Sequence, residues 1–301
     1  MTRDGFSALA AGGLDWDALP LRLWRKGNAM FWNAADIDLS QEAAGWATLE
    51  GEDLEAAARL SAMFLAGEEA VTHDIQPFMA AMSAQGRLGD EMYLAQFCFE
   101  EARHTEAFRR WFDAVGITAD LNPLVDDNPG YRAIFLKALP ESLGALRDDP
   151  SPANQIRASV TYNHIVEGVL ALTGYHAWNT VCQERGILPG MQSIVRHIGQ
   201  DERRHMAWGT YTCRRLVAAD ASLWQVVEDT MGELLPQALE AIGFLSQYDQ
   251  PLGLNVEDFV TYAAERATRR LGAISAALGQ DVAQVEADDA PVALEDELAS
   301  T

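Results

Sequence analysis

The sequence predicts an all-α protein, and three observations support this fold class. Apolar residues recur with the 3.6-residue period of an α-helix over long stretches. Alternating apolar and polar residues, which indicate β-strands, are nearly absent. Short clusters of Gly, Pro, Asn and Asp separate the periodic stretches, and long helices joined by short turns pack as antiparallel neighbours. Helices are expected over residues 53–84, 91–115, 131–146, 151–184, 191–218, 222–247 and 256–277.

The first two long helices are predicted to form a hairpin that follows an irregular N-terminal arm. Residues 1–52 mix Gly, Pro, Asn and Trp without a clear period, so we expect short helical pieces that wrap the core. Pro77 is expected to kink the leading helix, because proline removes a backbone donor. The segment 85–90 is a turn signal, Asp90 is expected to cap the return helix, and Gly116 to end it.

A second hairpin is predicted after a loop rich in Asp, Asn and Pro at residues 120–128 and one shorter helix. Ser151-Pro152 opens its leading helix, since proline fits the first helical turn. Residues 186–190 form its turn. Two further helices complete a helical domain that we expect to span residues 53–277.

Composition limits the possible functions. The 301 residues are 49% hydrophobic, which is enough for a packed core, and the formal net charge is −23. Such acidity argues against nucleic-acid binding, which requires Lys and Arg to displace counterions from phosphates. No apolar run reaches the ~20 residues of a membrane span and no signal peptide is evident, so a cytoplasmic protein is expected. Residues 278–301 are rich in acids and lack Lys and Arg, as is typical of a solvated acidic tail.

Each hairpin carries one Glu on its leading helix and a Glu-x-x-His pair on its return helix. Residues three apart lie on one helix face, so each pair directs a carboxylate and an imidazole to the same point. Because each turn lies near the midpoint between its two glutamates, their side chains are expected at similar depth. Four glutamates and two histidines are the di-iron or di-manganese ligand set of ferritin-like four-helix bundles. The candidate metal ligands are Glu68, Glu101, His104, Glu167, Glu202 and His205.

Other side chains near these motifs leave alternatives open. His164 and His73 are competing ligands at helical spacing from a glutamate, but the repeat gives them no counterpart, which favours structural roles. Asp201 is a candidate to accept a hydrogen bond from the far nitrogen of His104, and the alternative is an exposed acid. Cys98 either lies near the site or is a small buried filler, and the absence of a CxxC motif argues against a thiolate site.

Four stretches resemble the ligand-binding oxidases related to the ribonucleotide reductase small subunit in residue, order and spacing. They are residues 67–71, 99–104, 162–168 and 201–205, and the resemblance extends from the Trp-rich arm to about Arg270. It implies a ferritin-like bundle with additional helices and a mixed manganese–iron centre that reacts with dioxygen. Glu68, Glu101 and His104 would mainly serve manganese, and Glu167, Glu202 and His205 would serve iron, with Glu101 bridging.

The resemblance also implies chemistry beyond the metals. It implies an ether cross-link between Val71 and Tyr162, a further tyrosine near the site at Tyr175, a long-chain fatty acid in an apolar tunnel, and a homodimer. From spacing alone, Val71 shares a helix face with Glu68, whereas Tyr162 lies five residues before the next ligand, which is not a face-sharing spacing in an α-helix. The alternative role is plain core packing for Val71, and a buried tyrosine with one hydrogen bond for Tyr162. Oxygen and imidazole ligands do not distinguish manganese from iron, so a di-iron centre stays open.

Three functions are compatible with this pattern. The first is a dioxygen-activating oxidase that removes hydrogen from a strong C–H bond of a hydrocarbon or of its own chain. The second is a radical-storing ribonucleotide reductase small subunit. Most such subunits carry a tyrosine where this sequence has Phe108, but a class that stores its oxidising equivalent on the metals lacks it, so Phe108 alone does not decide. These subunits also dock the large subunit through a C-terminal segment that carries a tyrosine, whereas no aromatic residue follows Tyr262 here. The third is an iron store or a helical scaffold.

Overall fold

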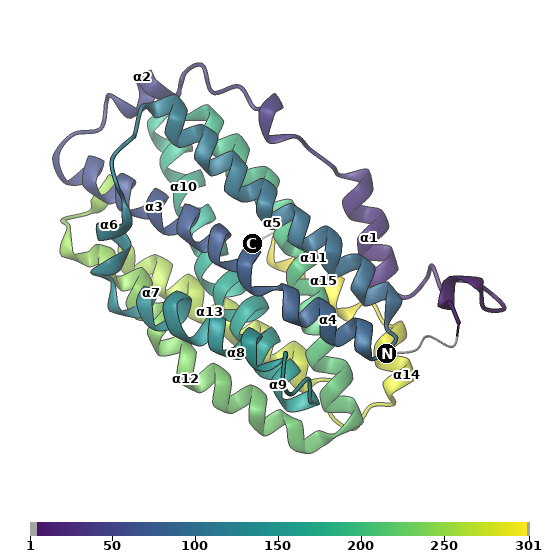
Figure 1. Ribbon diagram of the computed structural model, residues 1–301. Coiled ribbons are helices and arrows are strands. Elements are labelled where there is room, and N and C mark those ends of the chain that lie inside the picture. The colour runs from purple at the N-terminus through teal and green to yellow at the C-terminus, as the bar shows by residue number, and fades with distance from the viewer. Residues whose placement is uncertain (1–4, 300–301) are drawn as a thin grey trace.

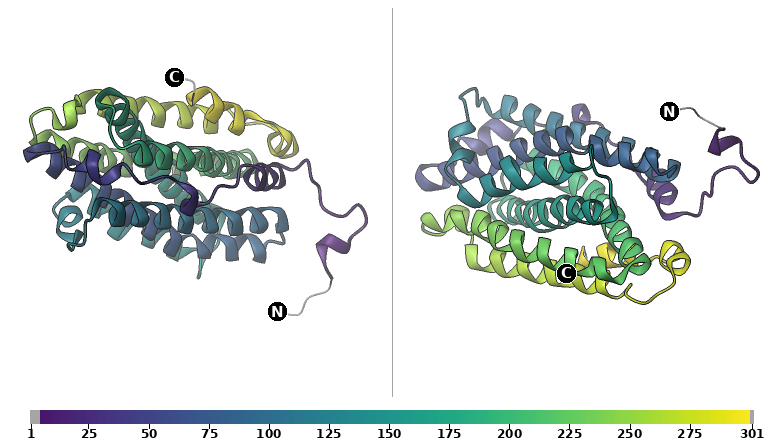
Figure 2. Two further views of the ribbon diagram at one scale, coloured as in Figure 1. Left: turned by 90° about the horizontal axis from the view of Figure 1, so that it is seen from above. Right: turned by 60° about the horizontal axis from the view of Figure 1, so that its bottom comes forward.

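The long helices lie in three layers that run side by side (Figures 1 and 2). The structure is a computed structural model that describes residues 5–299. Among these residues it contains no β-strand, which confirms the all-α prediction. The α-helices are α1 (Leu19–Ala29), α2 (Glu42–Trp46), α3 (Gly51–Asp74), α4 (Gln76–Ala84), α5 (Leu88–Val115), α6 (Asn122–Asp126), α7 (Pro129–Ala133), α8 (Leu139–Ala145), α9 (Pro152–Ser159), α10 (Leu172–Arg185), α11 (Pro189–Ala219), α12 (Trp224–Gly243), α13 (Val256–Ser275), α14 (Val282–Ala287) and α15 (Ala290–Leu298).

Four helical segments surround the centre of the molecule. They are α3, α5, α11 and a continuous run in which the π-helix η4 (Val160–Ala171) joins α9 to α10. Helix α3 packs along α5, α11 packs along η4 and α10, and α5 contacts α11. The predicted ferritin-like bundle is therefore present, and α12 and α13 cover η4 as additional helices (Figure 2). Among residues 5–299, no helix combines the length and apolar character that crossing a bilayer requires.

The first hairpin differs from its prediction at two points. Residues 53–84 belong to two helices, because α3 ends at Asp74 and α4 begins at Gln76. Pro77 lies in the first turn of α4. Backbone N–H groups in a first turn have no partner within the helix, so the missing N–H of proline costs no hydrogen bond there. Asp90 does not cap α5 but lies buried inside its first turn, where its carboxylate accepts a hydrogen bond from Trp208 Nε1 at 3.0 Å.

The second hairpin contains a feature that the apolar period does not reveal. Residues 160–171 form a π-helix, in which each backbone N–H donates to the carbonyl five residues earlier. Residues five apart therefore lie close to one face of this segment. The expectation that Tyr162 and Glu167 point in different directions rests on α-helical spacing, and it is wrong for this segment.

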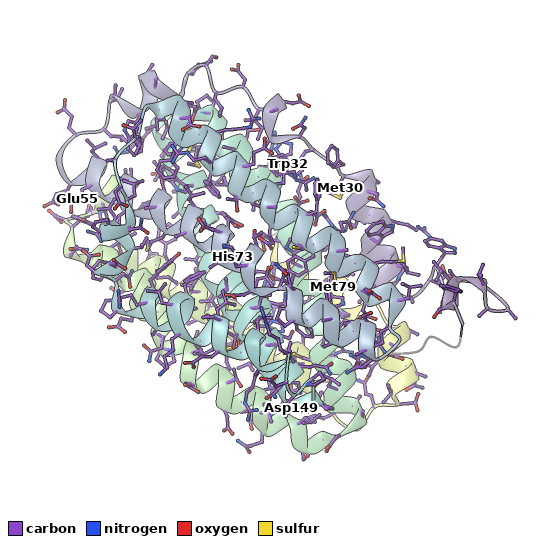
Figure 3. All side chains as sticks on the ribbon, in the orientation of Figure 1. Met30, Trp32, Glu55, His73, Met79 and Asp149 are labelled. Atoms are coloured by element: carbon purple, nitrogen blue, oxygen red, sulfur yellow. The ribbon has the colours of Figure 1, made fainter. Side chains whose placement is uncertain are left out.

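The N-terminal arm follows α5 and then leads into the bundle (Figure 1). Its described part contains α1, α2 and the 3₁₀ turns η1 (Ser7–Leu9) and η2 (Ala34–Asp36). Residues 5–18 project from the body of the molecule, whereas Trp32 is buried where the arm passes α5 (Figures 2 and 3).

Residues 278–299, the described part of the predicted acidic tail, do not form the solvated segment that their charge suggests. Helices α14 and α15 both pack on α11. Val285, Leu294 and Leu298 bury their side chains, and Glu295 accepts a hydrogen bond from Arg270 at 2.7 Å while only 2% exposed. The number of acidic residues alone indicated a solvated tail. It took no account of the apolar residues that lie between the acids, or of the arginines elsewhere in the chain that pair with them.

Candidate metal centre

Six side chains predicted as metal ligands converge between the four central segments. All are buried, and the most exposed of them, Glu68, is only 5% exposed. Glu68 comes from α3, Glu101 and His104 from α5, Glu167 from η4, and Glu202 and His205 from α11.

The six side chains form two overlapping groups, and within each group the candidate ligand atoms lie within 4.8 Å of one another. The first group is Glu68, Glu101, His104 and Glu202. The second group is Glu101, Glu167, Glu202 and His205. The structure thus brings all six predicted side chains together, and two of them, Glu101 and Glu202, reach both groups.

The two histidines direct their Nδ1 atoms toward the carboxylates. His104 Nδ1 lies 3.3 Å from Glu68 Oε2 and 3.5 Å from Glu101 Oε2. His205 Nδ1 lies 3.1 Å from Glu101 Oε1 and 3.3 Å from Glu167 Oε1. One nitrogen of each ring therefore faces the carboxylates of its own ligand group and could bind a cation together with them.

The other nitrogen of each histidine meets an acid from the opposite hairpin. His104 Nε2 lies 3.2 Å from Asp201 Oδ2, the contact expected from the sequence. His205 Nε2 lies 2.9 Å from Glu100 Oε2, a contact that the sequence reasoning missed. The signal was available, because Glu100 directly precedes Glu101 just as Asp201 directly precedes Glu202.

Buried donors hold these outer acids in place. Arg103 Nη2 donates to Asp201 Oδ2 at 2.6 Å, and Arg204 Nη2 donates to Glu100 Oε1 at 2.7 Å. Trp32 Nε1, from the arm, also donates to Asp201 Oδ2 at 2.7 Å. Each arginine immediately precedes its site histidine, so the acid, the ligand pair and the arginine recur as one unit in both return helices.

Burial and mutual contacts set the protonation of the centre when no cation is present. Burial raises the pKa of Glu68 to about 8 and raises the pKa of Glu167 well above its usual range. Burial also opposes ionisation of Glu101, but the adjacent imidazoles of His104 and His205 outweigh it and lower the pKa of that carboxyl. The pKa of each histidine is raised well above its usual range, since the surrounding carboxylates outweigh the effect of burial.

The residues present fit a pair of divalent cations. Glu167 Oε1, Glu202 Oε2 and His205 Nδ1 are buried and have no hydrogen-bond partner within residues 5–299. Such orphaned polar atoms are costly unless a ligand satisfies them. Four carboxylates would nearly neutralise two divalent cations, and oxygen with imidazole donors suits manganese and iron.

The two tyrosines that the family resemblance singled out both reach the carboxylates. Tyr162 Oη donates to Glu101 Oε1 at 3.1 Å, and Tyr175 Oη donates to Glu68 Oε1 at 2.9 Å. Val71 is 3% exposed and lies one helical turn after Glu68.

Asn163, which the sequence reasoning did not single out, donates through Nδ2 to Glu167 Oε2 at 3.0 Å. The π-helical turn that aligns Tyr162 with Glu167 also presents this amide to the ligand from four residues earlier.

An apolar cavity leads away from the carboxylates. Glu68, Glu101, Glu167 and Glu202 line one part of it, and almost all the other lining side chains are apolar. These come mainly from α3, η3 (Ile134–Ala138), η4, α10, α12, η6 (Phe244–Gln247), η7 (Pro251–Gly253) and α13, and include Phe64, Val71, Phe135, Leu170, Leu252 and Phe259.

The competing ligands lie outside both groups. His73 is exposed on α3, with Nε2 3.9 Å from Glu69 Oε1 (Figure 3). His164 is fully buried on η4, and burial together with the charge of Arg270 lowers its pKa to about 3. Cys98 is half-buried against the core, and burial raises its pKa, as does the charge of Glu101 to a smaller extent.

The family model described as ribonucleotide reductase, small chain matches residues 19–275. Among solved structures, the R2-like ligand-binding oxidase from Sulfolobus acidocaldarius is 35% identical, with a TM-score of 0.83, over 94% of this chain and 99% of that one. An R2-like ligand-binding oxidase with an aerobically reconstituted Mn/Fe cofactor is 35% identical, with a TM-score of 0.86, over 91% of this chain and 98% of that one. The chain therefore belongs to the ribonucleotide reductase small-chain family and is similar to its R2-like ligand-binding oxidases over nearly its whole length.

Proposed function

We propose that this protein is a dioxygen-activating oxidase with a heterodinuclear Mn/Fe centre. The observation that carries the proposal is the convergence of the two Glu-x-x-His pairs and two further glutamates in one buried site, in contact with a tyrosine hydroxyl and an apolar cavity. The similar oxidase with an Mn/Fe cofactor supports the choice of metals.

Glu68, Glu101 and His104 would mainly hold manganese, and Glu167, Glu202 and His205 would mainly hold iron. When bound, the two metals supply the electrons and the charge that activate dioxygen. Asp201 and Glu100 fix the orientation of the two imidazoles through their Nε2 atoms, which leaves each Nδ1 directed at the metal position. Burial keeps bulk water away from the reacting groups.

The proposed reaction of the chain itself joins Val71 and Tyr162. A carbon–oxygen bond forms between the β-carbon of Val71 and the phenolic oxygen of Tyr162. One C–H and one O–H bond break, and dioxygen accepts the two protons and two electrons that leave. Glu101 accepts the hydrogen bond of the Tyr162 hydroxyl, so it is placed to receive the phenolic proton.

The apolar cavity would hold a long-chain fatty acid or a similar ligand. Its carboxylate-lined part is where a ligand headgroup would meet the metals, and its apolar remainder suits a hydrocarbon chain. Oxidation of such a hydrocarbon by the same centre is the proposed reaction on an external substrate.

Intact mass after exposure to Mn(II), Fe(II) and air tests the self-oxidation. We expect a chain lighter by two hydrogen atoms, with the change mapped to linked peptides that contain Val71 and Tyr162. Tyr162→Phe is the matched control, because it removes only the hydroxyl and should bind both metals without losing mass. An unchanged mass in the aerated, metal-loaded wild-type protein would refute the cross-link.

Organic extraction of the purified protein followed by mass spectrometry tests the ligand. We expect a long-chain fatty acid from the wild type and much less from Leu170→Trp, which fills the cavity from η4. Leu136→Trp changes an exposed leucine outside the cavity lining and should leave the yield unchanged. Equal yields from the two variants, or no fatty acid from the wild type, would contradict this assignment.

The radical-storing subunit is less well supported than the oxidase. The solved structures to which the chain is similar are described as ligand-binding oxidases. Phe108, at the position where most radical-storing subunits carry a tyrosine, is fully buried and stacks on Phe64 with ring centroids 5.3 Å apart, but this position alone does not decide, because one class of such subunits lacks the tyrosine. The homodimer and the cytoplasmic location stay predictions.

A further inference from the structure

A second cavity, of about 570 Å³, opens between α10, α11, α13 and α15. Arg196 and Arg203 of α11 and Arg266 of α13 line it, and Glu295 is the one acidic residue in its lining. The whole chain has 45 acidic residues against 22 Lys and Arg, whereas basic residues outnumber acidic ones in the lining of this cavity.

The negative charge of Glu295 is already compensated. Its Oε2 accepts a hydrogen bond from Arg270 Nη2 at 2.7 Å, and the charges of Arg266 and Arg203 also act on it. An incoming anion would therefore meet a net positive lining.

Contacts with the cavity wall hold the guanidinium of Arg266 in place. Arg266 lies 4.1 Å from the ring centre of Tyr262 and donates to Leu298 O at 2.6 Å. The ring of Tyr262 stacks on His176, with centroids 4.7 Å apart and planes at 13°. These contacts fix the Arg266 guanidinium at the cavity wall, so its positive charge acts on an anion in the cavity from a fixed position.

Further donors face the same cavity. Within the described part of the chain, Arg203 makes one hydrogen bond, from Nε to Gly199 O at 3.1 Å, so its Nη groups are available. Asn179 also lines the cavity and accepts hydrogen bonds through Oδ1 from Gln183 and Gln192, and no hydrogen bond from its NH₂ group is found among residues 5–299.

We propose that this cavity is a binding site for a small oxyanion, a molecule that carries a phosphate or carboxylate group. Arginine forks and an amide NH₂ are donors that match such oxygens, and they surround a volume large enough for an organic anion. The site is separate from the metal centre but adjacent to it, because Tyr175 lines both cavities and donates to Glu68. The inference does not depend on the proposed oxidase function.

Calorimetric titration of the metal-loaded protein, freed of unbound metal, tests the site. The probes are inorganic phosphate and succinate, each compared with sodium chloride at equal ionic strength. We expect at least one of them to bind, and Arg203→Gln to weaken its binding at least tenfold. Arg25→Gln removes a positive charge from the exposed face of α1 and should leave the affinity within about twofold.

Arg196→Gln provides a second variant, because this exposed side chain can change without disturbing the packing. It should weaken the same probe, and unchanged melting temperatures of both variants would show that folding is intact. Preference for phosphate or for succinate identifies the headgroup. Failure of both probes to bind beyond the chloride control, or equal losses in Arg203→Gln and Arg25→Gln, would overturn the proposal.

Discussion

At the residue scale, each site histidine uses its two ring nitrogens for different tasks. Nδ1 faces the carboxylates of the ligand group to which that histidine belongs, and Nε2 contacts an acid from the opposite hairpin. Because each hairpin supplies the acid that contacts the histidine of the other, the orientation of each imidazole depends on both hairpins. Loss of one outer acid should therefore affect mainly the metal held by the histidine it contacts.

Glu100→Gln tests this division. The substitution removes the negative partner of His205 Nε2 and also weakens the contact from Arg204. We expect metal affinity at the second group to fall about 10- to 100-fold, with the first group less affected. Metal titration against a competing chelator measures both affinities.

Asp201→Asn is the complementary variant and should weaken the first group instead, since Asp201 contacts His104. Glu106→Gln, at an exposed position on the same helix as Glu100, should change neither affinity. Equal losses at both groups in Glu100→Gln would argue against separate orientation of the two histidines.

The candidate ligands could be predicted from the sequence because helical spacing alone fixes which residues share a face. The same reasoning singled out Asp201 but passed over Glu100, although the repeat offers both. Tyr162 could not be aligned with Glu167, because the alignment depends on a π-helix that apolar periodicity does not reveal.

At the element scale, one close helix crossing depends on a single glycine. A β-carbon at Gly130 of α7 would lie 2.3 Å from Gln237 O and 2.6 Å from Ala241 N on α12. Both contacts are with backbone atoms, which cannot move aside without shifting α12. The crossing in turn positions Ala241, which lines the apolar cavity.

Gly130→Ala should therefore destabilise the protein by more than about 2 kcal/mol, as expected for overpacking against rigid backbone. Gly144→Ala is the matched control, because α8 leaves open space around that position. It should stabilise by about 0.5–1 kcal/mol through helix propensity. Chemical denaturation measures both, and similar effects of the two substitutions would show that the α7–α12 crossing adapts.

The C-terminal helices are the other element-scale feature that depends on burial. Val285 is fully buried on α14, whereas Ala283 of the same helix is exposed. Val285→Asp should destabilise the protein by about 2–4 kcal/mol, since it removes apolar burial and introduces an unpaired charge.

Ala283→Asp adds the same charge at an exposed position and should change stability by less than about 0.5 kcal/mol. The free energy of unfolding from thermal or chemical denaturation distinguishes the two. If both variants were equally stable, α14 would contribute little to the folded state, and the acidic segment would behave as the solvated tail that its charge suggests.

At the scale of the whole molecule, the fold encloses four buried glutamates whose negative charge must be balanced by protons or by cations. The bundle and its additional helices follow from apolar periodicity and turn residues, and so they could be predicted. The packing of α15 could not, because it depends on partners distant in sequence, such as Arg270 for Glu295. The division of the first leading segment is predicted only as a kink at Pro77, beside which α4 begins. The same long-range packing raises the pKa of Glu68 and of both site histidines.

These pKa directions predict how stability depends on pH without metal. Between pH 7 and 8, Glu68, with a pKa of about 8, and the two site histidines hold protons in the folded state that they lose in the unfolded chain. Stability therefore falls as pH rises, by about 1.4 kcal/mol per pH unit for each such proton. His164, with its pKa lowered to about 3, acts in the opposite direction only below its unfolded pKa of about 6.5, so it does not contribute in this window.

Thermal unfolding of chelator-treated protein from pH 7 to 8 should therefore show a falling melting temperature. Addition of Mn(II) should reverse the trend, because the cation competes with protons for the same oxygen and nitrogen atoms and binds more tightly as pH rises. Glu68→Gln, which cannot titrate, should reduce the slope of the metal-free protein. A metal-free melting temperature that rises across this window would mean that the buried carboxylates and histidines do not retain protons, and that the charge of the centre is balanced in another way.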